Sequence, residues 1–152
     1  MRLILQRVAR ASVTVAGERV AAIGRGLLVL AGVERGDGAA QAAAAADKIA
    51  RLRIFGDAEG KMNLDLAQAG GAVLLVSQFT LAASTDRGRR PSFERAAPAG
   101  EARQLLEVLA AELRRAGLEV ETGRFAARME VELINDGPVT LVLDFPSSPG
   151  QS

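Results

Sequence analysis

The run GLLVLAGV at residues 26–33 contains eight consecutive apolar residues. A strand with one solvent-exposed face alternates apolar and polar side chains, and this run does not alternate. We therefore predict a strand that is buried on both faces. A second run, AVLLVSQF at residues 72–79, is the other strongly apolar strand of the chain. These two runs form the predicted centre of the sheet.

Two stretches between the strand-rich ends are predicted as helices, at about residues 38–53 and 100–116. Asp37 is a candidate cap for the first helix, and Gly117 is a good stop for the second. The apolar faces are the basis of both predictions. They consist of Ala42, Ala45, Ile49 and Leu52 in the first helix, and Ala102, Leu105, Leu106, Leu109 and Leu113 in the second.

Shorter strands are predicted on both sides of this central part. Their ranges are 2–8, 12–15, 19–23, 118–122, 129–134 and 139–145, with a hairpin turn at 135–138. This order argues for α/β architecture in a single domain at residues 1–145, with a mixed sheet and two long helices. Residues 146–152 lack apolar side chains, and we expect a flexible C-terminal tail.

Composition excludes several kinds of chemistry. The 152 residues include no cysteine and no histidine, which excludes disulfides, thiolate nucleophiles and Ser-His relays. An enzyme of this composition must move protons with carboxylates, lysine, water or its substrate. The 19 basic and 18 acidic residues leave a net charge of +1, so only a local nucleic-acid patch is expected.

Several familiar sites are absent from the sequence. It contains no GxGxxG, P-loop or GxSxG pattern. The neighbouring Asp57, Glu59 and Asp65 fit a hydrophilic turn better than a metal site. The first residues do not resemble a signal peptide, and polar residues interrupt the uncharged stretch 66–85. We therefore expect no membrane segment and a cytoplasmic location.

Two short motifs could carry chemistry. Ser77-Gln78-Phe79-Thr80 follows an apolar strand, and ligands bind at strand ends in such sheets. Its backbone N–H groups could form an oxyanion hole, or the segment could simply cap the strand. The block Asn135 to Thr140 (NDGPVT) fits an ordinary hairpin turn when it is considered alone.

Taken together and in this order, the two motifs give the chain a resemblance to the D-aminoacyl-tRNA deacylases over nearly its whole length. Further matching blocks are Gln6-Arg7-Val8, Ala11-Ser12-Val13, residues 26–33, Lys48-Ile49, Leu52 to Phe55, Lys61-Met62-Asn63, Gly88 to Phe93 and Gly123-Arg124-Phe125. The family pattern GRFGADM reads GRFAARM here, with Ala126 and Arg128 as the departures. Alanine costs little at this position unless the backbone requires a positive φ.

The resemblance implies hydrolysis of the ester that joins a D-amino acid to the terminal adenosine of tRNA, which serves chiral proofreading in translation. It implies a homodimer with a three-layer fold, a barrel-like sheet and the active site at the dimer interface, without cofactor or metal. Clearance of glycyl-tRNA is left open. The alternative is a non-catalytic nucleic-acid-binding protein of the same fold. A generic esterase would lack the histidine machinery.

The resemblance also implies roles for individual residues. Ser77, Gln78, Phe79 and Thr80 form the catalytic loop, in which the Phe79 and Thr80 N–H groups hold the oxyanion. Attack by Thr80 and water activation by the substrate's 2′-hydroxyl are the two mechanisms considered, and the second is favoured because threonine has no histidine partner. Further expected roles are a chirality gate at Gly137 and Pro138 with a cis bond, pocket support from Arg7, Phe125 and Met129, and tRNA contacts from Arg87, Arg89 and Arg90.

Overall fold

The structure is a computed structural model that describes residues 1–147, so residues 148–152 of the predicted tail lie outside it. The described elements are β1 (Arg2–Val15), β2 (Glu18–Ile23), β3 (Gly26–Gly32), α1 (Ala39–Arg51), β4 (Phe55–Gly56), β5 (Met62–Leu64), β6 (Ala72–Ser77), the 3-10 helix η1 (Phe79–Ala82), α2 (Ala99–Arg115), β7 (Glu119–Thr122) and β8 (Glu130–Asp144).

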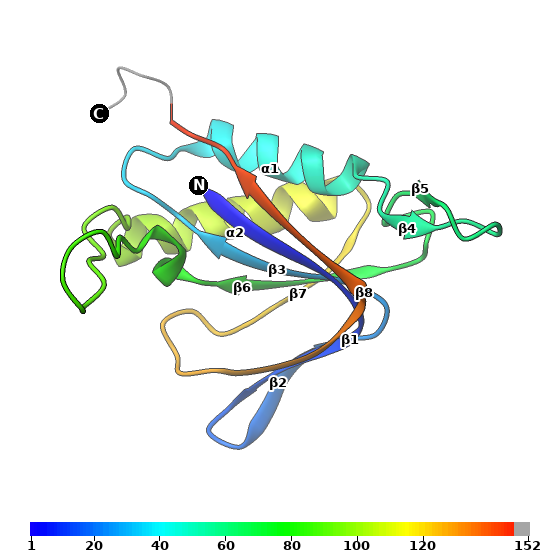
Figure 1. Cartoon of the computed structure of the whole chain (residues 1–152), viewed down its shortest axis with the longest axis horizontal. Coiled ribbons are helices and arrows are strands. Elements are labelled where there is room, and N and C mark those ends of the chain that lie inside the picture. Colours follow the sequence, from blue (N-terminus) through cyan, green and yellow to red (C-terminus); the bar gives the residue numbers. More distant parts are fainter. Residues whose placement is uncertain (148–152) are drawn as a thin grey trace.

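Six strands form one mixed sheet in the order β2-β1-β3-β6-β7, and β8 pairs with β1. The long strands β1 and β8 run antiparallel and bend together, so the sheet folds back on itself (Figure 1). Both α-helices lie on one side of the sheet, and the half that carries β2 lies on the other (Figure 1). The prediction of a single α/β domain with a barrel-like mixed sheet and two long helices is confirmed.

The three layers enclose two apolar cores. The larger core lies between the helices and the sheet, and it includes Leu27, Ile49, Phe55 and Leu109, all fully buried. The smaller core lies inside the folded sheet. There Val13, from the part of β1 that pairs with β2, meets Leu74 and Val76 of β6. Figure 1 shows these two parts of the sheet facing each other. Burying apolar surface on both faces of β3 and β6 is the main driving force for this arrangement.

The two apolar runs are confirmed as the central strands. Strand β3 pairs with β6 in parallel, and β6 pairs with β7 in parallel, with α1 and α2 in the two crossovers. A Cβ at Gly26 would lie 1.9 Å from the carbonyl oxygen of Ala72, so only glycine allows these strands to pair this closely. Because parallel strands end at the same edge, the residues after β3, β6 and β7 come together there.

Three sequence predictions need correction. Residues 2–8 and 12–15 form the single strand β1, because its pairing with β8 continues through both halves. Gly38, not Asp37, is the N-cap of α1, and its N–H donates to the Gln41 side chain at 2.7 Å. The Asp37 carboxylate instead accepts hydrogen bonds from the Met1 amino group at 2.8 Å and from the Glu34 N–H at 2.7 Å.

The third correction concerns the C-terminal part of the chain. The predicted hairpin turn at residues 135–138 does not reverse the chain, because residues 130–144 form the single strand β8. The turn residues instead form a bulge within this strand. Among the described residues, neither α-helix is long and apolar enough to cross a membrane.

Candidate active site

The catalytic loop predicted at residues 77–80 begins where β6 ends. The strand stops at Ser77 and not at Phe79, because the Gln78 carbonyl accepts a hydrogen bond from the Leu81 N–H at 3.2 Å and starts η1. The Gln78 N–H donates to the Ala31 carbonyl at 2.8 Å, which ties the loop to β3. A Cβ at Gly32 would lie 2.8 Å from the Leu81 Cβ, so this glycine lets η1 pack on β3.

Two neighbouring N–H groups in this loop are available for a ligand. Within residues 1–147, neither the Phe79 N–H nor the Thr80 N–H donates to a protein acceptor. The first N–H groups of any helical turn lack partners inside the turn. Two such donors in sequence can stabilise the negative oxygen that develops when an ester carbonyl is attacked.

The side chains of the loop have different surroundings. The Gln78 amide N–H donates to the Thr80 hydroxyl oxygen. A neutral amide is not a base through either its nitrogen or its oxygen, so this contact gives the Thr80 hydroxyl no group that could take its proton. The Phe79 ring is 55% exposed and meets the Phe93 ring edge-on, with the centroids 5.1 Å apart.

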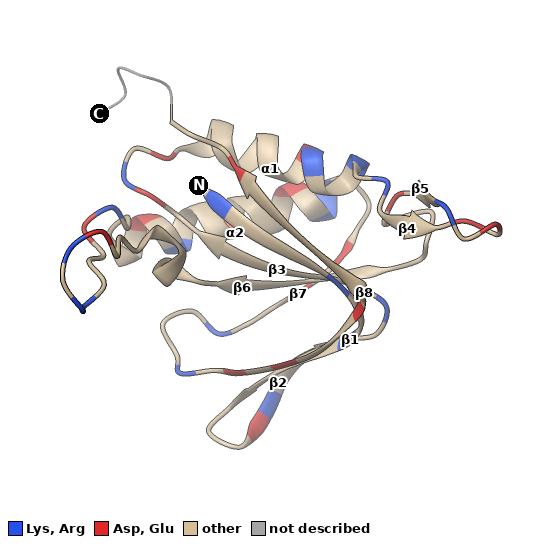
Figure 2. Ribbon diagram, viewed as in Figure 1, with Lys and Arg blue, Asp and Glu red and all other residues tan. Residues whose placement is uncertain are grey.

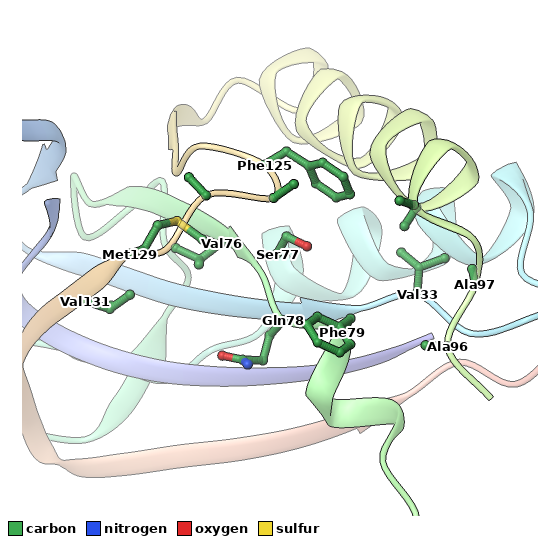
Figure 3. A pocket seen from close by; sticks show the side chains of 14 residues that line it. Val33, Val76, Ser77, Gln78, Phe79, Ala96, Ala97, Phe125, Met129 and Val131 are labelled. Atoms are coloured by element: carbon green, nitrogen blue, oxygen red, sulfur yellow. The ribbon is translucent and has the colours of Figure 1, made fainter. Parts of the chain in front are cut away.

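An apolar cavity of about 540 Å³ adjoins the loop. Its walls come from the end of β6, η1, the start of α2 and the segment between β7 and β8. Figure 3 shows Ser77 beneath the Phe125 ring, with Met129 and Val131 at one end of the cavity and Val33 at the other. The cavity can enclose apolar parts of a small ligand next to Ser77.

The segment between β7 and β8 is held over the cavity by backbone contacts. The Gly123 N–H donates to the Leu75 carbonyl at 3.0 Å, and a Cβ at Gly123 would lie 2.8 Å from the Met129 sulfur. Ala126 lines the cavity with a φ of 60°. The backbone there does require a positive φ, so alanine at this departure from the resembled pattern is strained.

The block Asn135 to Thr140 forms an exposed bulge in β8. Gln6 pairs with Thr140 and Val8 pairs with Asn135, so four residues of β8 lie opposite Arg7 alone. The Arg7 guanidinium donates to the Asp136 carbonyl at 2.9 Å and to the Ile54 carbonyl at 2.7 Å. The Arg7 side chain is only 16% exposed, so it fills the space behind the bulge.

Asn135 closes the bulge from the other side. Its side-chain oxygen accepts a hydrogen bond from the Val139 N–H at 2.8 Å, and its amide donates to the Thr140 hydroxyl at 2.9 Å. The Gly137–Pro138 peptide bond is cis, as predicted, and Gly137 has a φ of 139°. A Cβ at Gly137 would lie 2.9 Å from a Val139 methyl and 3.1 Å from the Arg7 guanidinium.

The structure separates the predicted site residues into two groups. Ser77, Gln78, Phe79, Phe125 and Met129 line the apolar cavity. Gly137, Pro138 and Arg7 instead line a shallow groove beside the β4–β5 hairpin. Figure 1 shows the bend of β8 far from η1, at the opposite end of the sheet. Within one chain, the predicted gate therefore does not border the cavity.

Arginine side chains gather on the loop between η1 and α2, where Figure 2 shows several basic segments. Arg87, Arg89 and Arg90 are exposed, and a backbone bridge between Ser84 and Ser92 closes the loop that carries them. No carboxylate of residues 1–147 lies within ion-pair distance of these three arginines. The loop can therefore accept anions from solvent.

Asp57, near the β4–β5 hairpin, has a structural role. Asp57 accepts hydrogen bonds from the Asn63 side chain and from the N–H groups of Lys61 and Glu59. These bonds, that from Asn63 foremost, lower the pKa of Asp57. No group of three potential metal-ligating His, Cys, Asp or Glu side chains occurs in the described part of the chain. The Asp57 contacts fit the predicted turn.

Sequence reasoning missed Gly32, which lets η1 pack on β3, and the role of Asn135, which holds the bulge from within. In the sequence, Gly32 stands out only as part of an apolar run, and Asn135 only as a turn residue. For Gly32, a glycine at the end of a buried strand is the available signal, because such a position often allows close approach of another backbone.

Known proteins match this chain over nearly its whole length. The family model described as D-Tyr-tRNA(Tyr) deacylase matches residues 4–144. A D-aminoacyl-tRNA deacylase from Heliobacterium modesticaldum is 58% identical over 144 residues, covering 95% of this chain and 96% of the relative. A D-aminoacyl-tRNA deacylase from Anaeromyxobacter dehalogenans is also 58% identical, covering 95% of this chain and 97% of the relative.

Two solved structures share the fold. One is described as c-Myc DNA Unwinding Element Binding Protein, with a TM-score of 0.89 and 39% identity, covering 96% of this chain and 99% of the other. The second is described as a probable eukaryotic D-amino acid tRNA deacylase. It has a TM-score of 0.80 and 19% identity, covers 95% of this chain and 98% of the other, and shows similarity of fold alone.

Proposed function

The chain belongs to the D-Tyr-tRNA(Tyr) deacylase family, and from this premise we propose that it hydrolyses the ester bond of D-aminoacyl-tRNA. Water adds to the ester carbonyl carbon, the bond to the ribose oxygen breaks, and free D-amino acid and tRNA result. The observation that carries the proposal is that the N–H groups of Phe79, which lines the cavity, and of the next residue, Thr80, have no acceptor among residues 1–147.

In this mechanism the backbone of the loop stabilises charge. As water attacks, the carbonyl oxygen becomes negative and accepts hydrogen bonds from the Phe79 and Thr80 N–H groups. Such donors act on the transition state more than on the ground state, so they lower the barrier and not merely KM. Their positions are set by the Gln78–Ala31 hydrogen bond and by the packing of η1 on Gly32.

The proton that water loses reaches the leaving 3′-oxygen through the substrate's own 2′-hydroxyl, which accepts that proton while it passes its own proton on. The Thr80 hydroxyl oxygen receives a hydrogen bond from the Gln78 amide, which cannot take the proton that a nucleophilic threonine must lose. We therefore favour the terminal ribose 2′-hydroxyl as the group that orients and activates water. Thr80 then contributes its N–H group, and its side chain shapes the loop together with Gln78.

Gly137 and Pro138 form the chirality gate in a homodimer. The bulge projects from β8 and is exposed, yet within its own chain it lies away from the cavity. A second copy of the chain could insert it beside the loop, so that main-chain atoms close to the α-carbon exclude an L side chain by steric clash. Glycine has no side chain to exclude, so we propose that glycyl-tRNA is also hydrolysed.

Mixed dimers test this arrangement. One chain carries Phe79→Pro, which removes a loop N–H, and the other carries Gly137→Ala, which obstructs the gate. If each site combines the loop of one chain with the gate of the other, the mixed dimer contains one intact site and recovers about half of the wild-type activity per dimer. If both parts act within one chain, mixing restores nothing.

The Arg87 to Arg90 loop is our candidate for contacts with tRNA phosphates, because its arginines are exposed and have no carboxylate partner among residues 1–147. Replacing Arg87, Arg89 and Arg90 with alanine should reduce the slope of log affinity against log salt by roughly 0.7–0.9 for each phosphate that is no longer neutralised. An unchanged slope would place the phosphate contacts elsewhere. We place the reaction itself in the cytoplasm, where translation takes place.

The direct test of function compares D-tyrosyl-tRNA, L-tyrosyl-tRNA and glycyl-tRNA as substrates. We expect loss of the D-ester and of the glycyl ester, with the L-ester left intact. Equal hydrolysis of D- and L-esters would indicate a generic esterase. Binding of nucleic acid without hydrolysis would favour the alternative, a non-catalytic nucleic-acid-binding protein. The solved structure with 39% identity, the c-Myc DNA Unwinding Element Binding Protein, is named for such binding.

A further inference from the structure

A second cavity shares two lining residues, Ser77 and Phe125, with the first. It measures about 380 Å³ and lies between α2, the end of β6 and the residues that follow β7. Because of the shared residues, the second cavity directly adjoins the proposed site of reaction. It is thus at the same carboxyl-terminal edge of the parallel strands, where ligands bind in such sheets.

The two cavities differ in charge. Within residues 1–147, no charged side chain lines the first cavity. Three arginines and one glutamate line the second, namely Arg103, Arg114 and Arg124 with Glu107. The second cavity therefore carries an excess of positive charge.

Two of the three arginines are available for a ligand. Neither Arg103 nor Arg124 forms an ion pair or a side-chain hydrogen bond with another described residue. The Arg103 guanidinium lies over the Phe125 ring, 5.2 Å from its centroid, which holds it at the boundary between the cavities. Arg114 is partly occupied, since it donates to the Val120 carbonyl at 3.0 Å.

We infer that the arginine-lined cavity binds the phosphates of the nucleotides that precede the terminal adenosine of the tRNA substrate. This inference rests on the proposed function. The substrate has an ester flanked on one side by an aminoacyl group and on the other by a polyanionic chain. The positive cavity would repel the cationic amino group of an aminoacyl ester, whereas guanidinium groups bind phosphate oxygens through paired hydrogen bonds.

The Arg87 to Arg90 loop serves a different part of the tRNA. Its arginines line neither of the two cavities that share Ser77. The cavity arginines contact the last few nucleotides, and the loop contacts phosphates farther from the ester.

The test uses two substrates, D-tyrosyl-tRNA and 3′-O-D-tyrosyl-adenosine, which has the ester but no phosphate. The variants are Arg103→Ala, Arg124→Ala and the double variant. Arg115→Ala is the matched control, because Arg115 also lies on α2, loses the same charge and lines neither cavity. Binding of uncharged tRNA is measured across a range of salt concentrations.

We expect the double variant to raise KM for D-tyrosyl-tRNA by roughly tenfold or more, because it cannot form these charge-assisted hydrogen bonds. The slope of log affinity against log salt should fall by roughly 0.7 for each phosphate of a single strand that is no longer neutralised. Hydrolysis of D-tyrosyl-adenosine should be unchanged, and Arg115→Ala should behave like the wild-type protein with both substrates.

An unchanged salt slope in the double variant, or an equal loss of activity on both substrates, would overturn the inference. If the wild-type protein hydrolyses neither substrate, the proposed function fails. The salt dependence of binding to uncharged tRNA then still decides whether Arg103 and Arg124 contact phosphates.

Discussion

The loop at residues 77–80 and the bulge at residues 135–140 both present main-chain atoms, yet they are held in different ways. The loop continues from a buried strand and is fixed by backbone contacts with β3, among them the Gln78–Ala31 hydrogen bond. The bulge interrupts an edge strand, and two polar side chains hold it, Arg7 from behind and Asn135 from within.

This difference predicts which substitutions each segment tolerates. In the loop, a change of side chain leaves the N–H groups in place, and only a change of backbone chemistry removes them. In the bulge, the polar side chains set the backbone conformation, so their removal alters the gate. Four substitutions can break or sharpen this contrast, and a fifth tests a strained residue beside the cavity; they follow from the largest expected effect to the smallest.

Phe79→Pro removes one proposed oxyanion donor, because proline has no backbone N–H. We expect kcat for D-tyrosyl-tRNA to fall by about 10²–10³-fold, as for other enzymes that lose one such donor. Phe79→Ala is the control, since it removes the ring and retains the N–H. Equal losses in both variants would show that the ring, and not the backbone, carries the effect.

Gly137→Ala places a methyl group 2.9 Å from Val139 at a φ of 139°, a conformation that alanine rarely adopts. We expect hydrolysis of D-tyrosyl-tRNA to fall by about 10²-fold, or rejection of the L-ester to weaken, because the gate is displaced. Gly17→Ala is the control, with a positive φ of 80° and no neighbour within 4 Å of the added Cβ. Wild-type rates and unchanged chiral preference would sink the proposed gate.

Asn135→Ala leaves the Val139 N–H without its acceptor. We expect the free energy of unfolding, measured with urea, to fall by about 1 kcal/mol. Discrimination between D- and L-tyrosyl-tRNA should weaken in the same variant. Thr140→Val is a graded control, because it removes one of the two acceptors of the Asn135 amide and leaves the other, the Val139 carbonyl, in place. A stable Asn135 variant with full discrimination would show that Arg7 alone holds the bulge.

Thr80→Ala removes the hydroxyl and leaves both loop N–H groups. We expect kcat for D-tyrosyl-tRNA to fall far less than the roughly 10²-fold minimum expected for loss of a donor. Single-turnover hydrolysis is the suitable measurement, because it isolates the chemical step. If turnover disappears while folding and tRNA binding persist, Thr80 is the nucleophile and the contrast between loop and bulge fails.

Ala126→Gly should have the smallest effect. A non-glycine residue with a left-handed φ destabilises the folded protein by roughly 1–2 kcal/mol, and glycine removes this strain. The greater conformational freedom of glycine in the unfolded chain offsets roughly half of that gain. We expect a gain of roughly 0.5–1 kcal/mol in unfolding free energy with activity unchanged. Ala127→Gly should instead destabilise the protein, because Ala127 has no positive φ to relieve. Identical shifts would contradict strain at Ala126.

The central part of the fold followed from local patterns in the sequence. The apolar runs at residues 26–33 and 72–79 lack alternation, and the strands that form within them, β3 and β6, are covered on both faces. Helices α1 and α2 begin and end within about two residues of their predicted limits, because their apolar periodicity and the positive φ of Gly117 are local properties.

The long strands could not be delimited in this way. Asn135 to Pro138 has the composition of a turn, and turn residues occur equally in hairpins and in bulges. Pairing with β1 on both sides of the bulge keeps β8 continuous, and that pairing joins residues more than 115 positions apart. Likewise, Asp37 binds the Met1 amino group, a contact that no local pattern reveals.

The sequence by itself determined the family resemblance, the candidate loop, the candidate gate and the absence of histidine and cysteine chemistry, because these depend on residue identity and order. Only the tertiary structure decided that the Phe79 and Thr80 N–H groups find no acceptor in the described part of the chain, that Arg7 lies behind the gate and that Arg103 and Arg124 share a cavity next to Ser77. Hydrogen bonding and cavity lining depend on residues distant in sequence, which become neighbours when the buried strands and their covering layers assemble.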